Sequence, residues 1–283
     1  MPRLRTLLIL GRVSNLPTVW SNCLAGWWFG GGGNPEKLPF ILFGASFLYI
    51  GGMFLNDAFD VGFDSLNRRE RPIPSGAISL GKVWRWGLAW LALGMTSLIA
   101  AGIWPGILGA ILLVCIVMYD AIHKHFAVSP TIMAACRFLV YLVAASAGVW
   151  GVTGTTIWCA LALAFYVLGL SYLARKETLR GAKISWSWIF LCAPIALALL
   201  LNSGAFRKPA LLLSLILALW LVRSLAPLFL SRERRIGPAV SNLLAGIALV
   251  DFLACSDADR QFALIFLLLF GTTLLLQRFV PST

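Results

Sequence analysis

Ten long apolar segments restrict what this chain of 283 residues can fold into. They lie near residues 14–30, 38–56, 82–101, 104–120, 130–150, 155–174, 185–202, 209–230, 238–255 and 262–280. Each is long enough to cross a bilayer core of about 30 Å, and because lipid offers the backbone no hydrogen-bond partners, each must form a helix. We therefore predict an all-α polytopic transmembrane bundle of nine to ten helices, in which residues 1–283 form a single domain around a central cavity that opens to the cytoplasm.

The distribution of basic residues assigns the loops to the two sides of the membrane. A net charge of +12 indicates either nucleic-acid binding or a membrane topology signal. One set of alternate loops is rich in Lys and Arg, with Arg68, Arg69, Arg71, Lys82, Arg85, Lys124, Arg175, Lys176, Arg180, Lys183, Arg232, Arg234 and Arg235. The other set has only Lys37, Arg207, Lys208 and Arg260. The positive-inside rule then predicts a cytoplasmic amino terminus, membrane lipids as the surroundings and no nucleic-acid partner.

A cluster of acidic residues closes the segment 38–56. Of the eleven acidic residues in the chain, four lie in the stretch 56–76, namely Asp57, Asp60, Asp64 and Glu70. If the helix continues, Asn56, Asp60 and Asp64 stand at i, i+4 and i+8 on one face, with Asp57 beside them. Mg2+ binds carboxylates together with substrate phosphate oxygens. We predict a magnesium site formed by Asn56, Asp57, Asp60 and Asp64.

Basic residues follow these acids directly. Arg68, Arg69 and Arg71 lie within reach of any phosphate held at the acids, and Pro72 and Pro74 prevent the helix from continuing. The alternative interpretation is a solvated interfacial loop with incidental charges. Under that alternative, the helical spacing of the acids, the arginines after them and the proline turn would all occur together by chance.

Further polar residues are expected at the same cytoplasmic rim. One group ends the fourth segment and comprises Tyr119, His123, Lys124 and His125. A second group ends the sixth segment and comprises Tyr172, Arg175, Lys176 and Glu177. The histidines have an alternative role as part of a positive-inside anchor.

A few polar residues lie inside the apolar segments. The guanidinium of Arg137, one turn before Tyr141, is costly in a bilayer, so it faces a partner or a water-filled cavity unless it extends to the cytoplasmic surface. Asn15 and Asn22 share a helix face and serve either helix packing or substrate contact. Asp251, near the far end of its segment, is expected at the membrane interface rather than in the site.

An acid cluster, several bases and an apolar helical cavity suit a substrate with a diphosphate head and a lipid tail. This combination indicates an isoprenyl diphosphate. Magnesium and arginine would stabilise the leaving diphosphate, and the allylic cation would be shielded from water inside the bundle.

Three motifs in this region share the pattern of a known family. They are Asn56-Asp57-x-x-Asp60-x-x-x-Asp64, then Arg71-Pro-Ile-Pro-Ser-Gly76, then Tyr119 with Lys124. The first resembles the first aspartate-rich motif of the UbiA superfamily of intramembrane prenyltransferases, the second resembles the signature after that motif, and the third resembles the Tyr and Lys element after the fourth helix. The resemblance spans residues 12–180.

The resemblance implies Mg2+-dependent transfer of an isoprenyl group from a prenyl diphosphate donor to an aromatic or other lipophilic acceptor. It implies magnesium and diphosphate binding by Asn56, Asp60 and Asp64, with Asp57 in support, and diphosphate contacts from Arg71 and Lys124. We predict catalytic roles for Asp57, Asp60, Asp64 and Lys124. We predict diphosphate binding by Arg68, Arg71, Tyr119, Lys124, Arg137, Tyr172, Arg175, Lys176 and Glu177.

The chain departs from the family pattern at two places. Members usually carry a second aspartate-rich motif after the sixth helix, where this chain has Arg175-Lys176-Glu177. We hypothesise that Arg175 and Lys176 neutralise the diphosphate directly in place of a second Mg2+, while Glu177 replaces a lost acid. A tenth helix, where nine are usual, is the second departure. The acceptor is therefore left open among an aromatic acid, a quinone precursor, a tetrapyrrole and another lipid.

Two other functions fit parts of the sequence. A CDP-alcohol phosphotransferase also uses aspartates in the membrane and a metal, but its Asp-x-x-Asp-Gly-x-x-Ala-Arg pattern fails here because Asp60 is followed by Val-Gly-Phe-Asp. A non-catalytic lipid carrier would keep the prenyl-lipid cavity without turnover. Metal-dependent release of diphosphate distinguishes an enzyme from a carrier.

Overall fold

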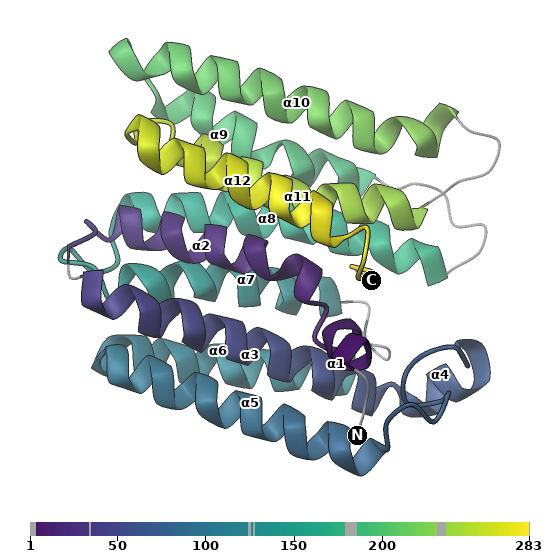
Figure 1. The fold of residues 1–283 in the computed structure, drawn as a ribbon. Helices are drawn as coiled ribbons and strands as arrows, with labels where there is room; N and C mark the ends of the chain where they lie inside the picture. Colours follow the sequence, from purple (N-terminus) through teal and green to yellow (C-terminus); the bar gives the residue numbers. More distant parts are fainter. Residues whose placement is uncertain are drawn as a thin grey trace.

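The computed structural model describes residues 4–33, 35–123, 126, 128–178, 186–230 and 236–282. These residues form a bundle of roughly aligned α-helices, shown in Figure 1. The helices that match the ten predicted segments are α2 (Leu16–Phe29), α3 (Leu38–Phe59), α5 (Leu80–Ala101), α6 (Ile103–Ile122), α7 (Ser129–Ala145), α8 (Gly154–Thr178), α9 (Ala193–Leu201) with the preceding 3-10 turn η3 (Trp186–Cys192), α10 (Arg207–Leu230), α11 (Ile236–Ala254) and α12 (Arg260–Leu276). The all-α class is confirmed.

Shorter elements lie at one end of the bundle. They are α1 (Leu4–Leu10), the 3-10 turn η1 (Val13–Asn15) and α4 (Val61–Asn67). In Figure 1, α1 and α4 lie at the end of the bundle where the letter C marks the carboxyl terminus. The other short 3-10 turns are η2 (Pro35–Lys37) and η4 (Gly204–Phe206). The sequence pattern did not predict α1 and α4, because each has only seven residues.

Among the described residues, six helices are long and apolar enough to cross a membrane, namely α3, α5, α6, α8, α10 and α11. Helices α7 and α12 are apolar but shorter, at 17 residues each. Many large apolar side chains on the helices of the bundle remain exposed, among them Ile103 of α6 and Leu200 of α9. Such surfaces suit lipid rather than water, and the chain is an integral membrane protein.

Proline residues help to set where the helices begin. Helices α2, α3, α7 and α9 each carry proline in the first two positions, where its missing N–H has no intrahelical partner to lose. Gly102 separates α5 from α6 with a φ of 145°, a conformation that residues with a side chain rarely adopt. Backbone chemistry therefore divides neighbouring apolar runs into separate helices.

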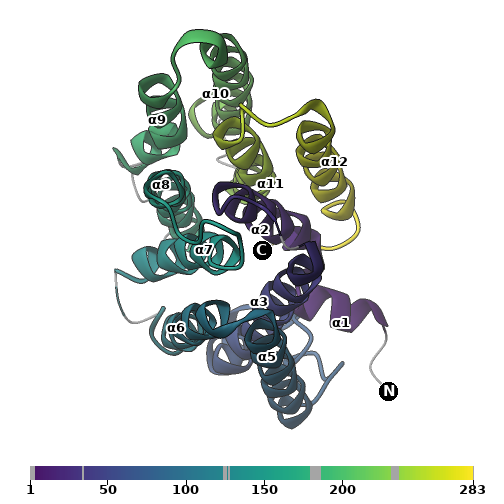
Figure 2. The same cartoon turned by 90° about the vertical axis from the view of Figure 1, so that its left-hand side faces the viewer.

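Helices α2 and α7 lie at the centre of the bundle. They contribute to a hydrophobic cluster with α3, α5 and α6 and to another with α8 to α12. Figure 2, a view along the helices, shows α2 and α7 between these two groups. The two halves of the chain therefore share one central helix pair.

The central helices approach each other closely because small residues face across the contact. A Cβ atom built on Gly26 of α2 would lie 2.5 Å from the backbone oxygen of Tyr141 in α7. Helices α3 and α5 meet in the same way, since a Cβ on Gly94 would lie 3.0 Å from the oxygen of Gly44. Close backbone approach through small residues is typical of helix packing in membranes.

Candidate functional site

The predicted acidic face forms at the end of α3. Helix α3 ends at Phe59, and Asp60 keeps right-handed helical angles before α4 begins. The amide of Asp60 donates to the oxygen of Asn56 at 3.0 Å, and the amide of Asp64 donates to the oxygen of Asp60 at 2.9 Å. The helical register therefore continues through the junction. Asn56, Asp57, Asp60 and Asp64 are all buried, so these four side chains are not part of a solvated loop, whereas Arg69 and Glu70 of the same stretch are exposed.

Arg71 crosses from the following loop to two of these acids. Its Nη1 atom donates to Oδ1 of Asp57 at 3.0 Å and to Oδ2 of Asp64 at 3.4 Å. The Arg71 side chain is mostly buried, so these ion pairs are less screened than pairs in water. The arginine holds together two carboxylates that would otherwise repel each other.

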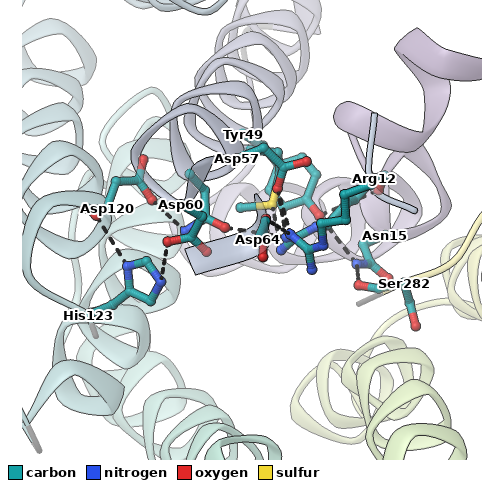
Figure 3. A network of polar contacts seen from close by, with 12 residues as sticks. Arg12, Asn15, Tyr49, Asp57, Asp60, Asp64, Asp120, His123 and Ser282 are labelled. Carbon is teal, nitrogen blue, oxygen red and sulfur yellow. Dashed lines mark hydrogen bonds and ion pairs between the residues drawn. The ribbon is translucent and has the colours of Figure 1, made fainter. Parts of the chain in front are cut away.

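Arg12, just before η1, reaches the same acids from the amino-terminal side. Its Nη2 atom donates to Oδ1 of Asp57 at 3.2 Å, as Figure 3 shows. The same atom donates to Oδ1 of Asn56 at 3.3 Å. Burial by itself lowers the pKa of Arg12, but the Asp57 carboxylate and other nearby groups raise it, and the net direction is upward. Arg12 has a φ of 41°, in the left-handed region, and such strain is often found at functional sites.

Helix α6 and its C-cap residue His123 contribute further polar residues to this site. Oδ1 of Asp120 accepts a hydrogen bond from Nδ2 of Asn56 at 3.2 Å. His123 places Nε2 3.3 Å from Oδ1 of Asp60, and the Tyr119 ring stacks on the His123 ring at 5.1 Å. Oδ2 of Asp120 is buried and has no hydrogen-bond partner among the described residues. We call the residues Asn56, Asp57, Asp60, Asp64 and Asp120 the acid cluster.

Two residues of the site were missed by the sequence reasoning, Arg12 and Asp120. Arg12 lies 44 residues before Asn56, so no local spacing connects the two. Asp120 carried a usable signal, since it is one of only eleven acidic residues and directly follows Tyr119 at the end of an apolar segment. The predicted role of Tyr119 at the site is compatible with its contact to His123.

Other predicted site residues lie elsewhere or outside the described part of the chain. Arg68 directly follows α4, and its backbone oxygen accepts a hydrogen bond from the amide of Arg71 at 3.1 Å. Arg175 donates to the oxygen of Phe126 at 2.6 Å and to Oγ of Ser129 at 3.1 Å, so it holds the segment after α6. Tyr172 lies on α8 and is half-buried. Lys124 and the side chains of Lys176 and Glu177 lie outside the described residues.

Arg137 belongs to a second polar cluster, buried between α2, α7 and α11. It donates to Oδ1 of Asn22 at 2.6 Å and to Oγ1 of Thr18 at 3.1 Å. Oδ2 of Asp251 accepts from Asn22 at 2.7 Å and from Ser21 at 2.5 Å, and its Oδ1 accepts from Tyr141. We call this group the Asp251 cluster, and its members are Thr18, Ser21, Asn22, Arg137, Tyr141 and Asp251.

The Asp251 cluster changes two expectations. Asp251 was expected at the membrane interface, and this was wrong because the residue is 0% exposed and lies against α2 and α7. Arg137 was expected at the diphosphate site, but its side chain bonds to α2. The polar face of α2 therefore serves helix packing at Asn22.

The oxygen atoms of the acid cluster fit a hard cation. Carboxylates and carboxamides are ligands that Mg2+ accepts, and the Oδ2 atom of Asp120 has a coordination position that no hydrogen bond uses. Within the part of the chain that the structure describes, no three His, Cys, Asp or Glu side chains are already arranged around a metal position. Asp57 and Asp64 point instead to Arg71. The residue types fit magnesium, and binding would require these ion pairs to rearrange.

Comparison with known proteins shows the family of this chain. A model of the UbiA prenyltransferase family matches residues 15–250. The chain is 26% identical over 152 residues to the digeranylgeranylglyceryl phosphate synthase of Sulfolobus acidocaldarius, covering 52% of each chain. It is 36% identical over 90 residues to the synthase of the same name from Thermococcus kodakarensis, covering 31% of this chain and 32% of that one. The chain thus matches about half the length of the first relative and a third of the second.

Solved structures share the fold. A UbiA homolog from Aeropyrum pernix K1 has a TM-score of 0.67 at 17% identity, covering 88% of this chain and 98% of that one. A UbiA homolog from Archaeoglobus fulgidus, bound to GPP and Mg2+, has a TM-score of 0.55 at 17% identity, covering 95% and 98%. The resemblance expected from the aspartate-rich motif is confirmed, and it extends further along the chain than residue 180. Since the family model covers most of its length, the chain belongs to the UbiA prenyltransferase family.

Proposed function

We propose that this protein transfers an isoprenyl group from an allylic prenyl diphosphate to a lipophilic acceptor within the membrane. The observation that carries the proposal is the acid cluster, in which four buried aspartates and Asn56 meet two arginines at one end of an apolar bundle. Buried charges are expensive and are usually retained for function in a membrane protein. Family membership favours this reaction over that of a CDP-alcohol phosphotransferase.

In the proposed reaction, the bond between the allylic carbon and the diphosphate oxygen breaks, and its electron pair leaves with the diphosphate. The acceptor then forms a bond to that carbon with its own electron pair and releases a proton to the departing diphosphate. Arg12 and Arg71 pair with Asp57. Their side chains can move from this carboxylate to the diphosphate and stabilise its negative charge as it leaves. The apolar interior would keep water from the cation.

Asn56, Asp57, Asp60 and Asp64 would hold Mg2+, with Asp120 as a further ligand. When bound, the metal would supply positive charge to the diphosphate oxygens. Asp57, Asp60 and Asp64 keep their proposed catalytic role, together with Lys124. We also propose that Arg68, Tyr119 and Tyr172 contact the diphosphate. Arg175 and Lys176 would neutralise the diphosphate charge, and Glu177 would replace the acid that the second family motif usually supplies.

The proposed site faces the cytoplasm. This orientation is supported by the excess of Lys and Arg in the loops at the end of the bundle that holds α4. The amino terminus would lie on the same side, since Arg12 contacts Asp57 there.

The names of the relatives indicate which acceptor to try first. Adding one geranylgeranyl group to reach digeranylgeranylglyceryl phosphate requires an acceptor that already carries one such group. We therefore propose geranylgeranyl diphosphate as the first donor and geranylgeranylglyceryl phosphate as the first acceptor. Aromatic acceptors form the comparison series.

Release of diphosphate from geranylgeranyl diphosphate by the purified protein in detergent tests the donor half of this proposal. We expect release with Mg2+ but not with EDTA, and a loss of at least 100-fold in Asp60→Ala. The matched control is Glu70→Ala, which removes an exposed acid of the same stretch and is expected to keep native activity. Prenyl-lipid binding without any Mg2+-dependent release would instead favour a carrier.

A further inference from the structure

The segment after α12 folds back onto the amino-terminal turn η1. Nε2 of Gln277 donates to the backbone oxygen of Ser241 at 3.0 Å, and the Oγ atoms of Ser241 and Ser282 are 2.6 Å apart. Nδ2 of Asn15 donates to the backbone oxygen of Ser282 at 3.0 Å. Val280 and Ser282 are 4% and 5% exposed. Residues 277–282, which we call the return segment, thus lie between η1 and α11. Figure 1 places the mark C at the end of the bundle that holds α1, and Figure 2 places it near the middle of the cross-section.

Under the return segment, the Asn15 amide is only partly satisfied. Asn15 is 3% exposed, and its Nδ2 atom donates to the Tyr49 hydroxyl at 3.3 Å as well as to Ser282. Its Oδ1 atom is buried and has no hydrogen-bond partner in the described residues, and Oγ of the neighbouring Ser14 is in the same state. Buried polar atoms are almost always hydrogen-bonded. The Oδ1 atom of Asn15 is therefore able to accept a hydrogen bond from a bound ligand.

This position adjoins the acid cluster. Asn15 follows Arg12 by three residues, and Arg12 contacts Asp57. Tyr49, which accepts from Asn15, has its hydroxyl 3.5 Å from the backbone oxygen of Arg12. Figure 3 shows Asn15 and Ser282 on one side of Arg12 and the aspartates on the other. A group bound at Asn15 would therefore lie beside a substrate bound at the acids.

We propose that the Asn15 amide binds the hydroxyl group of the second substrate, a lipid alcohol, and that this substrate displaces the return segment. An alcohol fits both needs of the amide. Its oxygen can accept from Nδ2, in the place that the Ser282 carbonyl takes, and its hydrogen can be donated to the unsatisfied Oδ1. The inference rests on the proposed prenyl transfer, because it names the substrate class for the second half of that reaction.

A reversible cross-link tests whether the return segment must move. In Ser241→Cys with Ser282→Cys, the sulfur atoms would take the places of two oxygens 2.6 Å apart, near enough for a disulfide of about 2.05 Å. With the bridge closed, we expect donor diphosphate release within twofold of the reduced protein and prenyl transfer to geranylgeranylglyceryl phosphate lowered at least tenfold. Dithiothreitol should restore transfer. Equal transfer in the closed and open forms would overturn the proposal, and the two single-cysteine variants control for oxidation elsewhere.

A labelling experiment tests the same subsite without turnover, so it remains decisive if the protein transfers no prenyl group. Ser282→Cys is made in a background in which the exposed Cys192 is replaced by serine, and its reaction with a maleimide is timed. Geranylgeranylglyceryl phosphate should speed labelling at least fivefold, whereas its O-methyl ether, which has no hydrogen to donate, should not. The Asn15→Leu variant should lose the response to the alcohol. An unchanged rate with the alcohol, or an equal response to the ether, would refute the alcohol subsite.

Discussion

Replacing Asp251 by asparagine tests whether the Asp251 cluster joins the two halves of the bundle. The substitution keeps the size of the side chain, so it leaves no cavity and changes only hydrogen bonding and charge. The carboxylate accepts from Ser21, Asn22 and Tyr141. An asparagine offers one carbonyl oxygen and turns its NH2 group toward a donor that was bound before. At least one of the three donors must therefore lose its acceptor.

The size of the effect follows from these three hydrogen bonds. Leaving a buried donor unpaired costs about 1–3 kcal/mol, and a bond to a neutral acceptor is weaker by about 1 kcal/mol than one to a charged acceptor. Hydrogen bonds between helices in a membrane average about 0.6 kcal/mol each, so the loss of three such bonds sets the lower limit of the expected destabilisation. We expect the free energy of unfolding to fall by about 2–4 kcal/mol. Arg137 adds to the loss, because it bonds to Asn22 and thereby depends on the same anion.

Equilibrium unfolding in mixed detergent micelles, with increasing sodium dodecyl sulfate and helicity as the readout, measures this loss. The control is Asp257→Asn, the same chemical change at an exposed position six residues further on, where we expect a change within about 0.5 kcal/mol. Asp251→Asn should unfold at a lower detergent fraction than this control. If the two variants unfold together, the hydrogen bonds of Asp251 do not hold α11 to α2 and α7, and the reasoning is refuted.

Three further perturbations test the packing and the site. Gly26→Ala places a methyl group 2.5 Å from the backbone oxygen of Tyr141 and should destabilise the bundle by about 1–3 kcal/mol. The control Gly271→Ala, where a Cβ atom would meet no atom within 4 Å, should keep native stability. Equal stability of the two variants in detergent would contradict the close contact of α2 and α7. Arg71→Ala should lower Mg2+-dependent diphosphate release at least tenfold in the detergent assay, and native rates would remove Arg71 from the site. Arg175→Ala should speed protease cleavage in the segment after α6, because that side chain holds the segment; if diphosphate release is also unchanged, neutralisation by Arg175 is excluded.

The sequence was sufficient for the features that depend on local physics. An apolar run in lipid has to be helical, so hydropathy predicted the all-α class and the positions of the helices that match the ten segments, although only six of the described helices are long enough to span a membrane. The acid spacing predicted that Asn56, Asp60 and Asp64 share a face, and the continuous register through Asp60 bears this out for the backbone. The motifs from Asn56 to Gly76 were also specific enough to indicate the family before any fold was known.

Tertiary structure alone decided which residues meet from distant parts of the chain. Arg12 and Asp120 join the acids from 44 and 64 residues away from Asn56, and Ser282 reaches Asn15 across 267 residues. Such distances leave no periodic trace in the sequence. The placement of Asp251 failed for a related reason. Position along an apolar segment predicts depth in the membrane, but the rotation of the helix about its axis depends on packing. Here packing directs the Asp251 carboxylate toward Ser21, Asn22 and Tyr141 instead of toward the membrane surface.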